Sequence, residues 1–290
     1  MSAHTFVVTG SSSGIGYATA AKLLEARQCV VMVCRDSDQS REARDRLIAE
    51  TGTDSGNVHL VYADLGSRSS TQAAIEEISA RHDEIDALIN NAGVFRRKRM
   101  VSADGNEQTL SVNYLAVVQM SSGLLPQLRA ANQGRIVNVS SDNFKKARID
   151  PSDLQSERHY KAGAAYAASK LLTVLYTVRL ARFLADTNVT VNAGHPGVAN
   201  SNVFKDYPPF VMWLLKPFTS SCESVAESPI YLATDPSLAD ISGQYFYREK
   251  LDKSWRQKVA QASPEFSDRV WEETKALMVG YSCAPADSTQ

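Results

Sequence analysis

Residues 9 to 16 have the sequence Thr9-Gly10-Ser11-Ser12-Ser13-Gly14-Ile15-Gly16, a glycine-rich turn that directly follows the apolar run 6–8. Beyond the turn, apolar residues recur every three to four positions, which predicts a helix over 15–27. Glycine lets the backbone turn sharply and approach a ligand without a Cβ in the way. Because the first N–H groups of a helix are unpaired, such a turn between a strand and a helix predicts a site for the pyrophosphate of a dinucleotide.

Apolar runs rich in β-branched residues alternate with helical segments along the rest of the chain. The predicted strands are 6–8, 30–33, 58–62, 87–89, 136–139 and 189–191, with a further short strand near 243–247. The predicted helices are 15–27, 38–50, 68–81, 107–130 and 163–186. This alternation predicts an α/β fold, a doubly wound parallel sheet of the Rossmann type that is covered on both faces. We expect a single domain, 1–281, followed by a loose polar tail, 282–290.

The composition is that of an ordinary globular domain. With 290 residues, 43% of them hydrophobic, and a formal net charge of -1, the chain can bury a full core and has no bias toward nucleic acid or anionic membrane. Its four cysteines form no Cys-x-x-Cys motif and its histidines show no His-x-x-x-His spacing, so we expect neither a disulfide framework nor a metal site. No apolar run is long enough to span a bilayer and no signal-like segment precedes the first strand, so the cytoplasm is the expected location.

Tyr166 and Lys170 lie four residues apart in a helix-forming run, which puts a phenol and an ammonium group on one helical face. A cation held about 4 Å from a phenol favours the phenolate by up to roughly 4 kcal/mol at an effective dielectric constant of about 20. We therefore expect Lys170 to lower the pKa of Tyr166, although burial opposes this effect. The same spacing is common on solvated helix faces, so the interpretation depends on the other motifs.

Two residues after the second strand give competing predictions for the cofactor. Arg35 suits the 2′-phosphate of NADP(H), whereas Asp36 lies about twenty residues beyond Gly16, where a carboxylate would bind the ribose hydroxyls of NAD(H). We favour NADP(H) over NAD(H). After the third strand, Asp64 and Leu65 are candidates to hold the adenine, and capping of the next helix is the alternative role for Asp64.

Three further motifs follow the later strands. Asn90-Asn91-Ala92-Gly93 follows the fourth strand, Ser140-Ser141 the fifth and Pro196-Gly197 the sixth. Together with the glycine turn and Tyr166-x-x-x-Lys170, they resemble the short-chain dehydrogenase/reductase family in order and approximate spacing, over about residues 4 to 250. The three-residue gap between Gly10 and Gly14 is the spacing of that family.

The resemblance implies a role for each of these residues. Tyr166 would be the acid/base, Lys170 would lower its pKa and hold the nicotinamide ribose, and Ser141 would orient the carbonyl. Ser140 would point into the structure. Asn113 would hold a water that links Lys170 to solvent, or would only satisfy backbone groups in a buried helix. The implied cofactor-binding residues are Gly10, Ser12, Ser13, Gly14, Ile15, Gly16, Arg35, Asp64, Leu65, Asn91, Ala92, Gly93, Tyr166, Lys170, Pro196, Gly197 and Val198.

A long insert separates Ser141 from Tyr166 and narrows the resemblance. With its segment 153–157 and the stretch 203–218, the chain resembles the retinol dehydrogenase and protochlorophyllide reductase-like branch, and Arg35 agrees with the NADP(H) preference of that branch. This implies a bulky apolar carbonyl or alcohol as substrate. Relatives in that branch are often membrane anchored, and no apolar anchor precedes the first strand, so a retinoid is not the natural substrate we expect.

Two other segments lie near the predicted site. The aromatic and apolar run 204–215 follows Pro196-Gly197, where this fold places a lid over the substrate, so we expect a lid over about 198–225. Ordinary core, a subunit interface and membrane contact are the alternatives for that run. The basic run Arg96-Arg97-Lys98-Arg99 would attract an acidic substrate or simply be solvated.

The chain is thus predicted to be an NADP(H)-dependent carbonyl reductase that reduces a ketone or aldehyde, or oxidises the matching alcohol. Alternatives are a catalytically silent nucleotide-binding sensor or scaffold, an NAD-dependent alcohol dehydrogenase, and a sugar-nucleotide epimerase or dehydratase. The intact catalytic set argues against the first, and the Gly10-to-Gly14 spacing argues against the last. The expected partner is a small molecule and not a nucleic acid, and both a monomer and a homo-oligomer fit the sequence.

Overall fold

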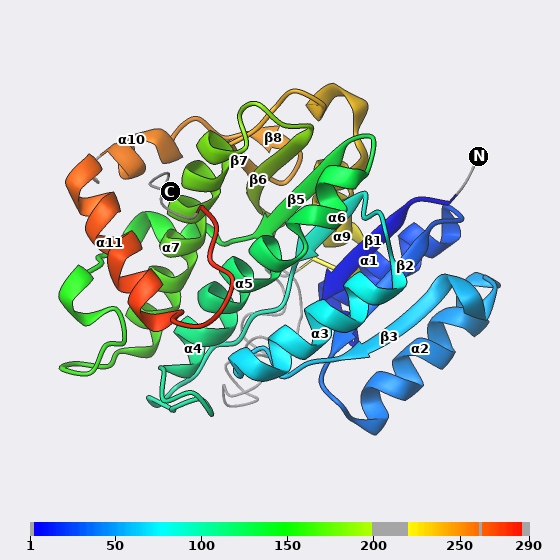
Figure 1. Ribbon diagram of the computed structural model, residues 1–290, viewed down its shortest axis with the longest axis horizontal. Coiled ribbons are helices and arrows are strands. Elements are labelled where there is room, and N and C mark those ends of the chain that lie inside the picture. Colours follow the sequence, from blue (N-terminus) through cyan, green and yellow to red (C-terminus); the bar gives the residue numbers. More distant parts are fainter. Residues whose placement is uncertain (1–2, 199–219, 261–262, 286–290) are drawn as a thin grey trace.

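The computed structural model describes residues 3–198, 220–260 and 263–285. Its centre is an eight-stranded sheet with the order β3-β2-β1-β4-β5-β6-β7-β8 (Figure 1). The strands are β1 (Thr5–Thr9), β2 (Cys29–Cys34), β3 (Val58–Tyr62), β4 (Ala87–Asn90), β5 (Gly134–Val139), β6 (Val189–His195), β7 (Tyr245–Tyr247) and β8 (Lys250–Leu251). All neighbouring pairs are parallel except β7 and β8, which form an antiparallel hairpin at one edge.

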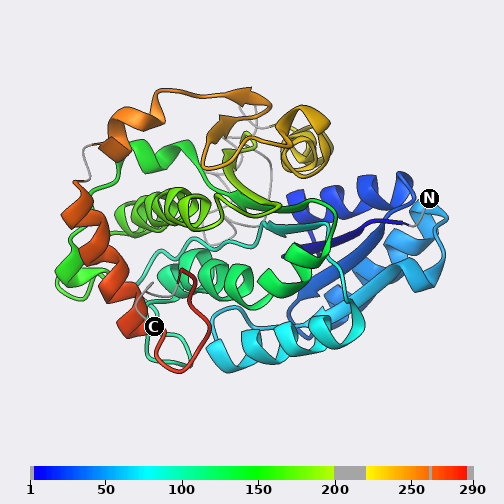
Figure 2. The ribbon, with the colours of Figure 1, turned by 45° about the horizontal axis from the view of Figure 1, so that its top comes forward.

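Helices cover both faces of the sheet. They are α1 (Gly14–Glu25), α2 (Asp38–Thr51), α3 (Arg68–Arg81), α4 (Gln108–Leu110), α5 (Ala116–Gly123), α6 (Leu125–Ala130), α7 (Ala162–Phe183), α9 (Cys222–Thr234), α10 (Trp255–Ala260) and α11 (Pro264–Leu277). The helices α1, α2 and α9 share one core with Val8 and Val30, whereas α3, α5, α7 and α11 share a second core with Val7 and Val31 (Figure 2). Because successive side chains of a strand point to opposite faces, strands buried on both sides are apolar at nearly every position.

The chain reverses its direction of progress across the sheet between β1 and β4. It builds β1, β2 and β3 outward in one direction and then returns to place β4 on the other side of β1. In an open α/β sheet, ligands bind at the carboxyl ends of the strands where the order reverses in this way. The glycine turn after β1 and the Asn90 turn after β4 therefore flank the expected ligand crevice.

The predicted parallel α/β fold is confirmed, and the predicted strands all occur. The single helix expected over 107–130 is divided: Ser111–Leu115 form a π-helical turn, α5 ends at Gly123, and Pro126 lies in the first turn of α6. A proline ring has no N–H to donate to the preceding turn, so it starts a new helix instead of continuing the old one. The helices α9, α10 and α11 were not predicted.

The C-terminal helix α11 is part of the core. Trp271 is 2% exposed, stacks on Tyr176 of α7 with ring centres 5.9 Å apart, and lies 5.1 Å from the Arg179 guanidinium. Beyond α11, Cys283 and Ala284 pack against the same core, so the first part of the expected loose tail is in contact with the domain. Residues 286–290 lie outside the described part of the chain, as does 199–219, which contains most of the expected lid and the run 204–215.

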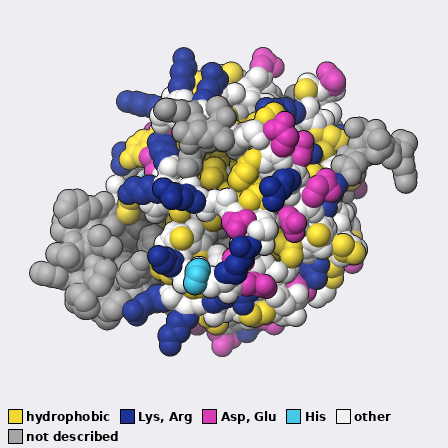
Figure 3. Space-filling view, turned by 90° about the vertical axis from the view of Figure 1, so that its left-hand side faces the viewer, with side chains coloured by type: hydrophobic (Ala, Val, Ile, Leu, Met, Phe, Trp, Pro, Cys, Tyr) yellow, Lys and Arg dark blue, Asp and Glu magenta, His cyan; other side chains and the backbone are white. Residues whose placement is uncertain are grey.

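Charges of both signs are distributed over the surface. On the face shown in Figure 3, Lys and Arg side chains predominate toward the left and Asp and Glu side chains lie mostly toward the right, with hydrophobic side chains between them. Both signs of charge therefore occur on this face, as expected for a chain with a formal net charge of -1.

Substitution of Trp271 by Ala should reduce the free energy of unfolding by about 3–5 kcal/mol, because it leaves a large cavity between α7 and α11. Val279→Ala is the control, since Val279 is 74% exposed only eight positions along the chain and should change stability by less than about 0.5 kcal/mol. Urea unfolding followed by circular dichroism measures both. Equal stability of the two variants would show that α11 does not belong to the cooperative core.

Candidate active site

The turn Asn90–Gly93, here called the Asn90 turn, is fixed against the end of β1 by hydrogen bonds between its first residues and Thr9. Thr9 Oγ1 accepts hydrogen bonds from the backbone N–H groups of Asn91 and Ala92, each at 3.0 Å. In return, Asn91 Nδ2 donates to Thr9 O at 2.8 Å and to Gly10 O at 3.4 Å. The sequence placed Asn91 in the cofactor site, and the structure shows that its side chain also holds the glycine turn in place.

The glycine turn has the geometry of a phosphate cradle. Gly10 and Gly14 have φ angles of 69° and 61°, a backbone conformation that residues other than glycine rarely adopt. A Cβ on Gly16 would lie 2.4 Å from both Asn91 Nδ2 and Gly10 O, so no side chain fits there. The helix α1 begins at Gly14, directly after the turn, and the first N–H groups of a helix have no partner within it. These features fit the pyrophosphate of a dinucleotide.

Arg35 follows β2 directly, and Arg41 in the first turn of α2 pairs with two nearby carboxylates. Arg35 is exposed. Asp36 is bound by Arg41, with 2.6 Å between Asp36 Oδ1 and Arg41 Nη1, and Arg41 also reaches Asp38 at 2.8 Å. Asp36 is therefore paired with a residue that sequence reasoning missed, because counting along the chain does not show which cation meets which carboxylate.

Asp64 follows β3 and has a local role in the structure. Its Oδ1 accepts a hydrogen bond from Gly66 N at 2.9 Å, which shapes the turn, and Ser67, not Asp64, caps α3 by accepting from Ser70 N. The capping role considered for Asp64 is therefore wrong. Asp64 remains exposed beside the partly buried Leu65, where both stay candidates for an adenine contact.

Three candidate catalytic side chains meet at the start of α7. Tyr166 and Lys170 are 8% and 4% exposed, and Ser141, at the end of the turn after β5, is also 8% exposed. Lys170 Nζ donates to Val139 O at 2.8 Å and lies 5.8 Å from the centre of the Tyr166 ring. Phe95 packs on the Tyr166 ring with 5.6 Å between ring centres. The helix thus brings together the phenol and the ammonium group as its four-residue spacing predicted.

Burial dominates the electrostatics of this pair. Burial raises the pKa of Tyr166 to about 12, and a hydrogen bond with Ser141 opposes the change. Burial also lowers the pKa of Lys170 to about 8. The expected lowering of the Tyr166 pKa by Lys170 is therefore not present in this structure, because desolvation disfavours the charged form of both groups. Near neutral pH the phenol holds its proton.

The two serines after β5 face different partners. Ser140 Oγ donates to Lys170 O at 3.1 Å and so points into the structure, whereas Ser141 interacts with Tyr166. Asn113 lies in the π-helical turn, where its Oδ1 accepts from Val94 N at 2.7 Å and its Nδ2 donates to Val94 O and to Ser169 Oγ. Its amide therefore satisfies backbone groups and joins the Asn90 turn to α7. π-Helical turns are frequent at functional sites.

Pro196, Gly197 and Val198 follow β6 at the same edge of the sheet. Pro196 is buried, Gly197 has a φ angle of 114°, and Val198 is 48% exposed. Burial lowers the pKa of the neighbouring His195, which is therefore neutral near pH 7. Gly93 lies close to Lys170 at the same edge of the sheet, since a Cβ on Gly93 would be 3.6 Å from Lys170 Nζ.

The long insert before Tyr166 is anchored to the basic run. Tyr160 donates to Arg96 O at 2.7 Å, and Arg99 Nε donates to Gln155 O at 3.2 Å. Gln155 Oε1 in turn accepts from Glu107 N. Arg96 and Arg99 thus take part in contacts that hold the insert, and Gln155 in the segment 153–157 is the partner of Arg99.

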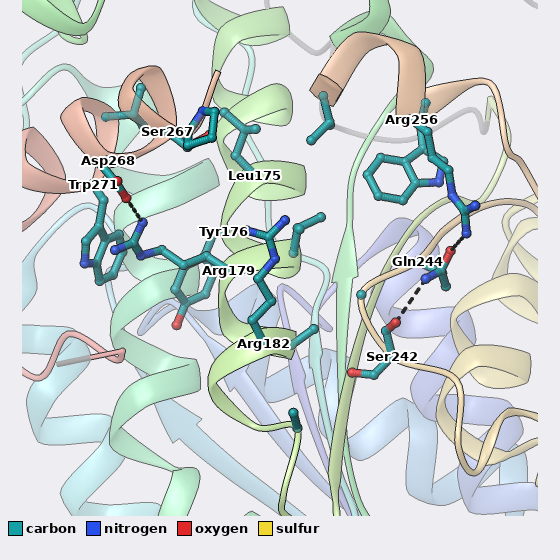
Figure 4. Close-up of a pocket in the computed structure, with 18 of the residues that line it drawn as sticks. Leu175, Tyr176, Arg179, Arg182, Ser242, Gln244, Arg256, Ser267, Asp268 and Trp271 are labelled. Atoms are coloured by element: carbon teal, nitrogen blue, oxygen red, sulfur yellow. Dashed lines mark hydrogen bonds and ion pairs between the residues drawn. The ribbon is translucent and has the colours of Figure 1, made fainter. Parts of the chain in front are cut away.

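A separate cavity of about 840 Å³ lies between α7, α10 and α11. Figure 4 shows Leu175, Arg179 and Arg182 of α7 on one side and Gln244 and Arg256 on the other. Arg179 pairs with Asp268 of α11, and Arg256 donates to Gln244. Ser141, Tyr166 and Lys170 do not line this cavity.

Among the described residues, no helix is both long enough and apolar enough to cross a bilayer. No group of three or more His, Cys, Asp or Glu side chains in the same residues is arranged to hold a metal ion.

The chain is similar to known proteins in both sequence and structure. The family model described as short chain dehydrogenase matches residues 4–210. Human retinol dehydrogenase 14 is 36% identical, with 92% of this chain and 86% of that protein covered, and human polyprenol dehydrogenase is 34% identical, with 88% and 81% covered. A Pseudomonas aeruginosa RhlG/NADP active-site complex is similar in structure, with a TM-score of 0.69, 25% identity, and 85% of this chain and 95% of that chain covered. The chain belongs to the short-chain dehydrogenase/reductase family of oxidoreductases and, within it, to the retinol dehydrogenase-like branch.

Proposed function

We propose that this chain is an NADP(H)-dependent oxidoreductase that reduces a bulky apolar aldehyde or ketone, or oxidises the corresponding alcohol. The observation that carries the proposal is the meeting of Tyr166, Ser141 and Lys170 beside Gly93 at the edge of the sheet where the glycine turn lies. When bound, the nicotinamide supplies or accepts the hydride.

Each side chain then has a separate task. Tyr166, protonated near neutral pH, donates its proton to the carbonyl oxygen during reduction. Ser141 binds the same oxygen and orients it. Lys170 holds the ribose of the cofactor, and its positive charge favours the phenolate that remains after proton transfer. Asn113 fixes Val94 and Ser169, and with them the relative position of the Asn90 turn and α7.

The preference for NADP(H) is supported by charge. Arg35 and Arg41 place two guanidinium groups near the end of β2, and the ion pair of Arg41 with Asp36 weakens the repulsion between that carboxylate and a 2′-phosphate. The NADP complex of the Pseudomonas aeruginosa protein agrees with this choice. Binding of NAD(H) through Asp36 is the second candidate, and it requires Asp36 to leave Arg41.

The substrate class rests on the named relatives. Retinol and polyprenol, which appear in their names, are long apolar alcohols. We propose an apolar substrate of similar size, with reduction as the direction when NADPH is the cofactor. A cytoplasmic location and the oligomeric state stay predictions, as does the lid over about 198–225.

Tyr166→Phe should lower kcat at least about 100-fold, because the proton donor is lost while the ring still packs on Phe95. The Kd for NADPH should change less than about twofold. Steady-state turnover of all-trans-retinal and decanal with NADPH, together with cofactor fluorescence, measures both quantities. Tyr17→Phe is the control, since its hydroxyl binds Glu50 on the outer side of α1. Undiminished turnover in Tyr166→Phe would remove the mechanism.

Arg35→Ala should weaken NADPH binding about tenfold or more and leave NADH binding nearly unchanged, because a charge-assisted contact to the 2′-phosphate is lost. Fluorescence titration with both cofactors checks this. Arg46→Ala, which removes an arginine bound to Tyr17 on the other side of α2, should leave both affinities unchanged. An equal loss for NADPH and NADH in Arg35→Ala would contradict the assignment of this residue to the 2′-phosphate.

A further inference from the structure

The turn that carries Ser141 is bonded to the far edge of the sheet. Ser141 caps a short 3-10 turn, Asp142–Lys146, and its Oγ accepts from Asn143 N at 3.4 Å. The next residue, Asp142, accepts a hydrogen bond at Oδ1 from the hydroxyl of Tyr245 in β7, at 2.8 Å. A residue adjacent in sequence to Ser141 is thus held by a strand about a hundred positions away.

Tyr245 is a rigid anchor. It is fully buried, pairs with Ala193 of β6 in the parallel ladder, and its ring meets Phe144 edge to face with 4.8 Å between ring centres. Burial raises the pKa of Tyr245, and the charge of Asp142 raises it further, so the hydroxyl keeps its proton and remains a donor. The Tyr245 hydroxyl is therefore held in place by the sheet and by the packing of its ring.

Lys145 closes the network into a loop. Its Nζ lies 3.1 Å from Asp142 Oδ2 and 2.7 Å from Asp252 Oδ2. Asp252 N donates to Tyr245 O at 3.0 Å, which returns the chain of contacts to β7. Both oxygens of Asp142 are thus engaged, one by Tyr245 and one by Lys145, so rotation of this side chain would break two contacts at once.

We propose that Asp142 and Tyr245 are positioning residues, which hold the Ser141 hydroxyl at Tyr166 by fixing the turn that carries it. The inference rests on the proposed function, in which Ser141 binds the carbonyl oxygen. An error of about 1 Å in the place of such a hydroxyl can reduce turnover by up to about 100-fold. A tether that only stabilised the β7–β8 hairpin would instead affect stability and not the action of Ser141.

Tyr245→Phe removes the hydroxyl and keeps the buried ring. We expect kcat with NADPH and all-trans-retinal or decanal to fall about tenfold, with KM and the Kd for NADPH changed less than about twofold. Tyr247→Phe is the matched control, since Tyr247 is two positions along the same strand and 41% exposed; it should keep the activity of the wild type.

A double-mutant cycle separates positioning from a structural role. If Tyr245 acts through Ser141, Tyr245→Phe should lower kcat less than about twofold once Ser141→Ala is present. An undiminished tenfold effect in that background would overturn the proposal, as would a Tyr245→Phe enzyme of full activity beside an impaired Ser141→Ala enzyme. Full activity of Ser141→Ala would instead show that the proposed role of Ser141 is wrong, and the positioning role would fall with it.

Changes at Asp142 test the same hydrogen bond from its other end, and carry the test if Tyr245→Phe does not fold. Asp142→Ala removes the acceptor and should lower kcat about tenfold. Asp142→Asn keeps an oxygen that can accept from Tyr245 and should lose less than about threefold. Equal kcat values for these two variants would overturn the proposal.

Discussion

The hydrogen bonds between Thr9 and the two residues after β4 are the constraint on which the site depends. Beyond the end of β4, the N–H group of Asn91 also bonds Ile89 O at 2.9 Å, whereas that of Ala92 bonds only Thr9 within the described part of the chain, and an unpaired N–H group in a buried place is costly. Thr9 Oγ1 accepts both, so the Asn90 turn must lie against the end of β1. Asn91 then occupies the space beside Gly16 in which a side chain would stand. The cradle is thus shaped by packing between two strands that are about eighty residues apart in the chain.

Burial shifts the pKa values of both catalytic groups. Lys170 and Tyr166 are both withdrawn from water, so burial favours the neutral amine and the neutral phenol, but with a pKa of about 8 most of Lys170 keeps its charge near neutral pH. A proton donor for carbonyl reduction has to be protonated before the reaction, and burial keeps the Tyr166 phenol in that state. The Coulomb attraction that the helical spacing suggests acts on the phenolate, which is the form left after the proton has moved. Desolvation therefore favours the protonated phenol before proton transfer, and the lysine charge favours the phenolate after it.

Much of this arrangement could be predicted from the sequence, because strands and motifs are local patterns. Apolar runs predicted the strands, the residues at their carboxyl ends predicted the candidate site, and the family resemblance supplied the distinction between Ser140 and Ser141. Long-range pairs could not be predicted. Nothing in the spacing shows that Arg41 pairs with Asp36 or that Tyr245 binds Asp142. The sequence of α11 does contain a signal for a helix: Pro264 suits the first turn, and apolar residues recur at helical spacing after it, at Phe266, Val270, Trp271 and Leu277.

Packing of α11 also bears on how two copies of the chain could associate. The helices that the sequence predicted over 107–130 and 163–186 correspond to α4 through α6 and to α7. In the structure, Tyr114 and Tyr176 on these helices are each 2% exposed, because α11 covers them: Tyr114 bonds Thr274 at 2.9 Å and Tyr176 stacks on Trp271. A dimer formed through this part of the surface would have to displace α11 and expose two tyrosines and a tryptophan. Burial of aromatic side chains is among the largest stabilising contributions in a core, so such a displacement would oppose dimerisation by that route.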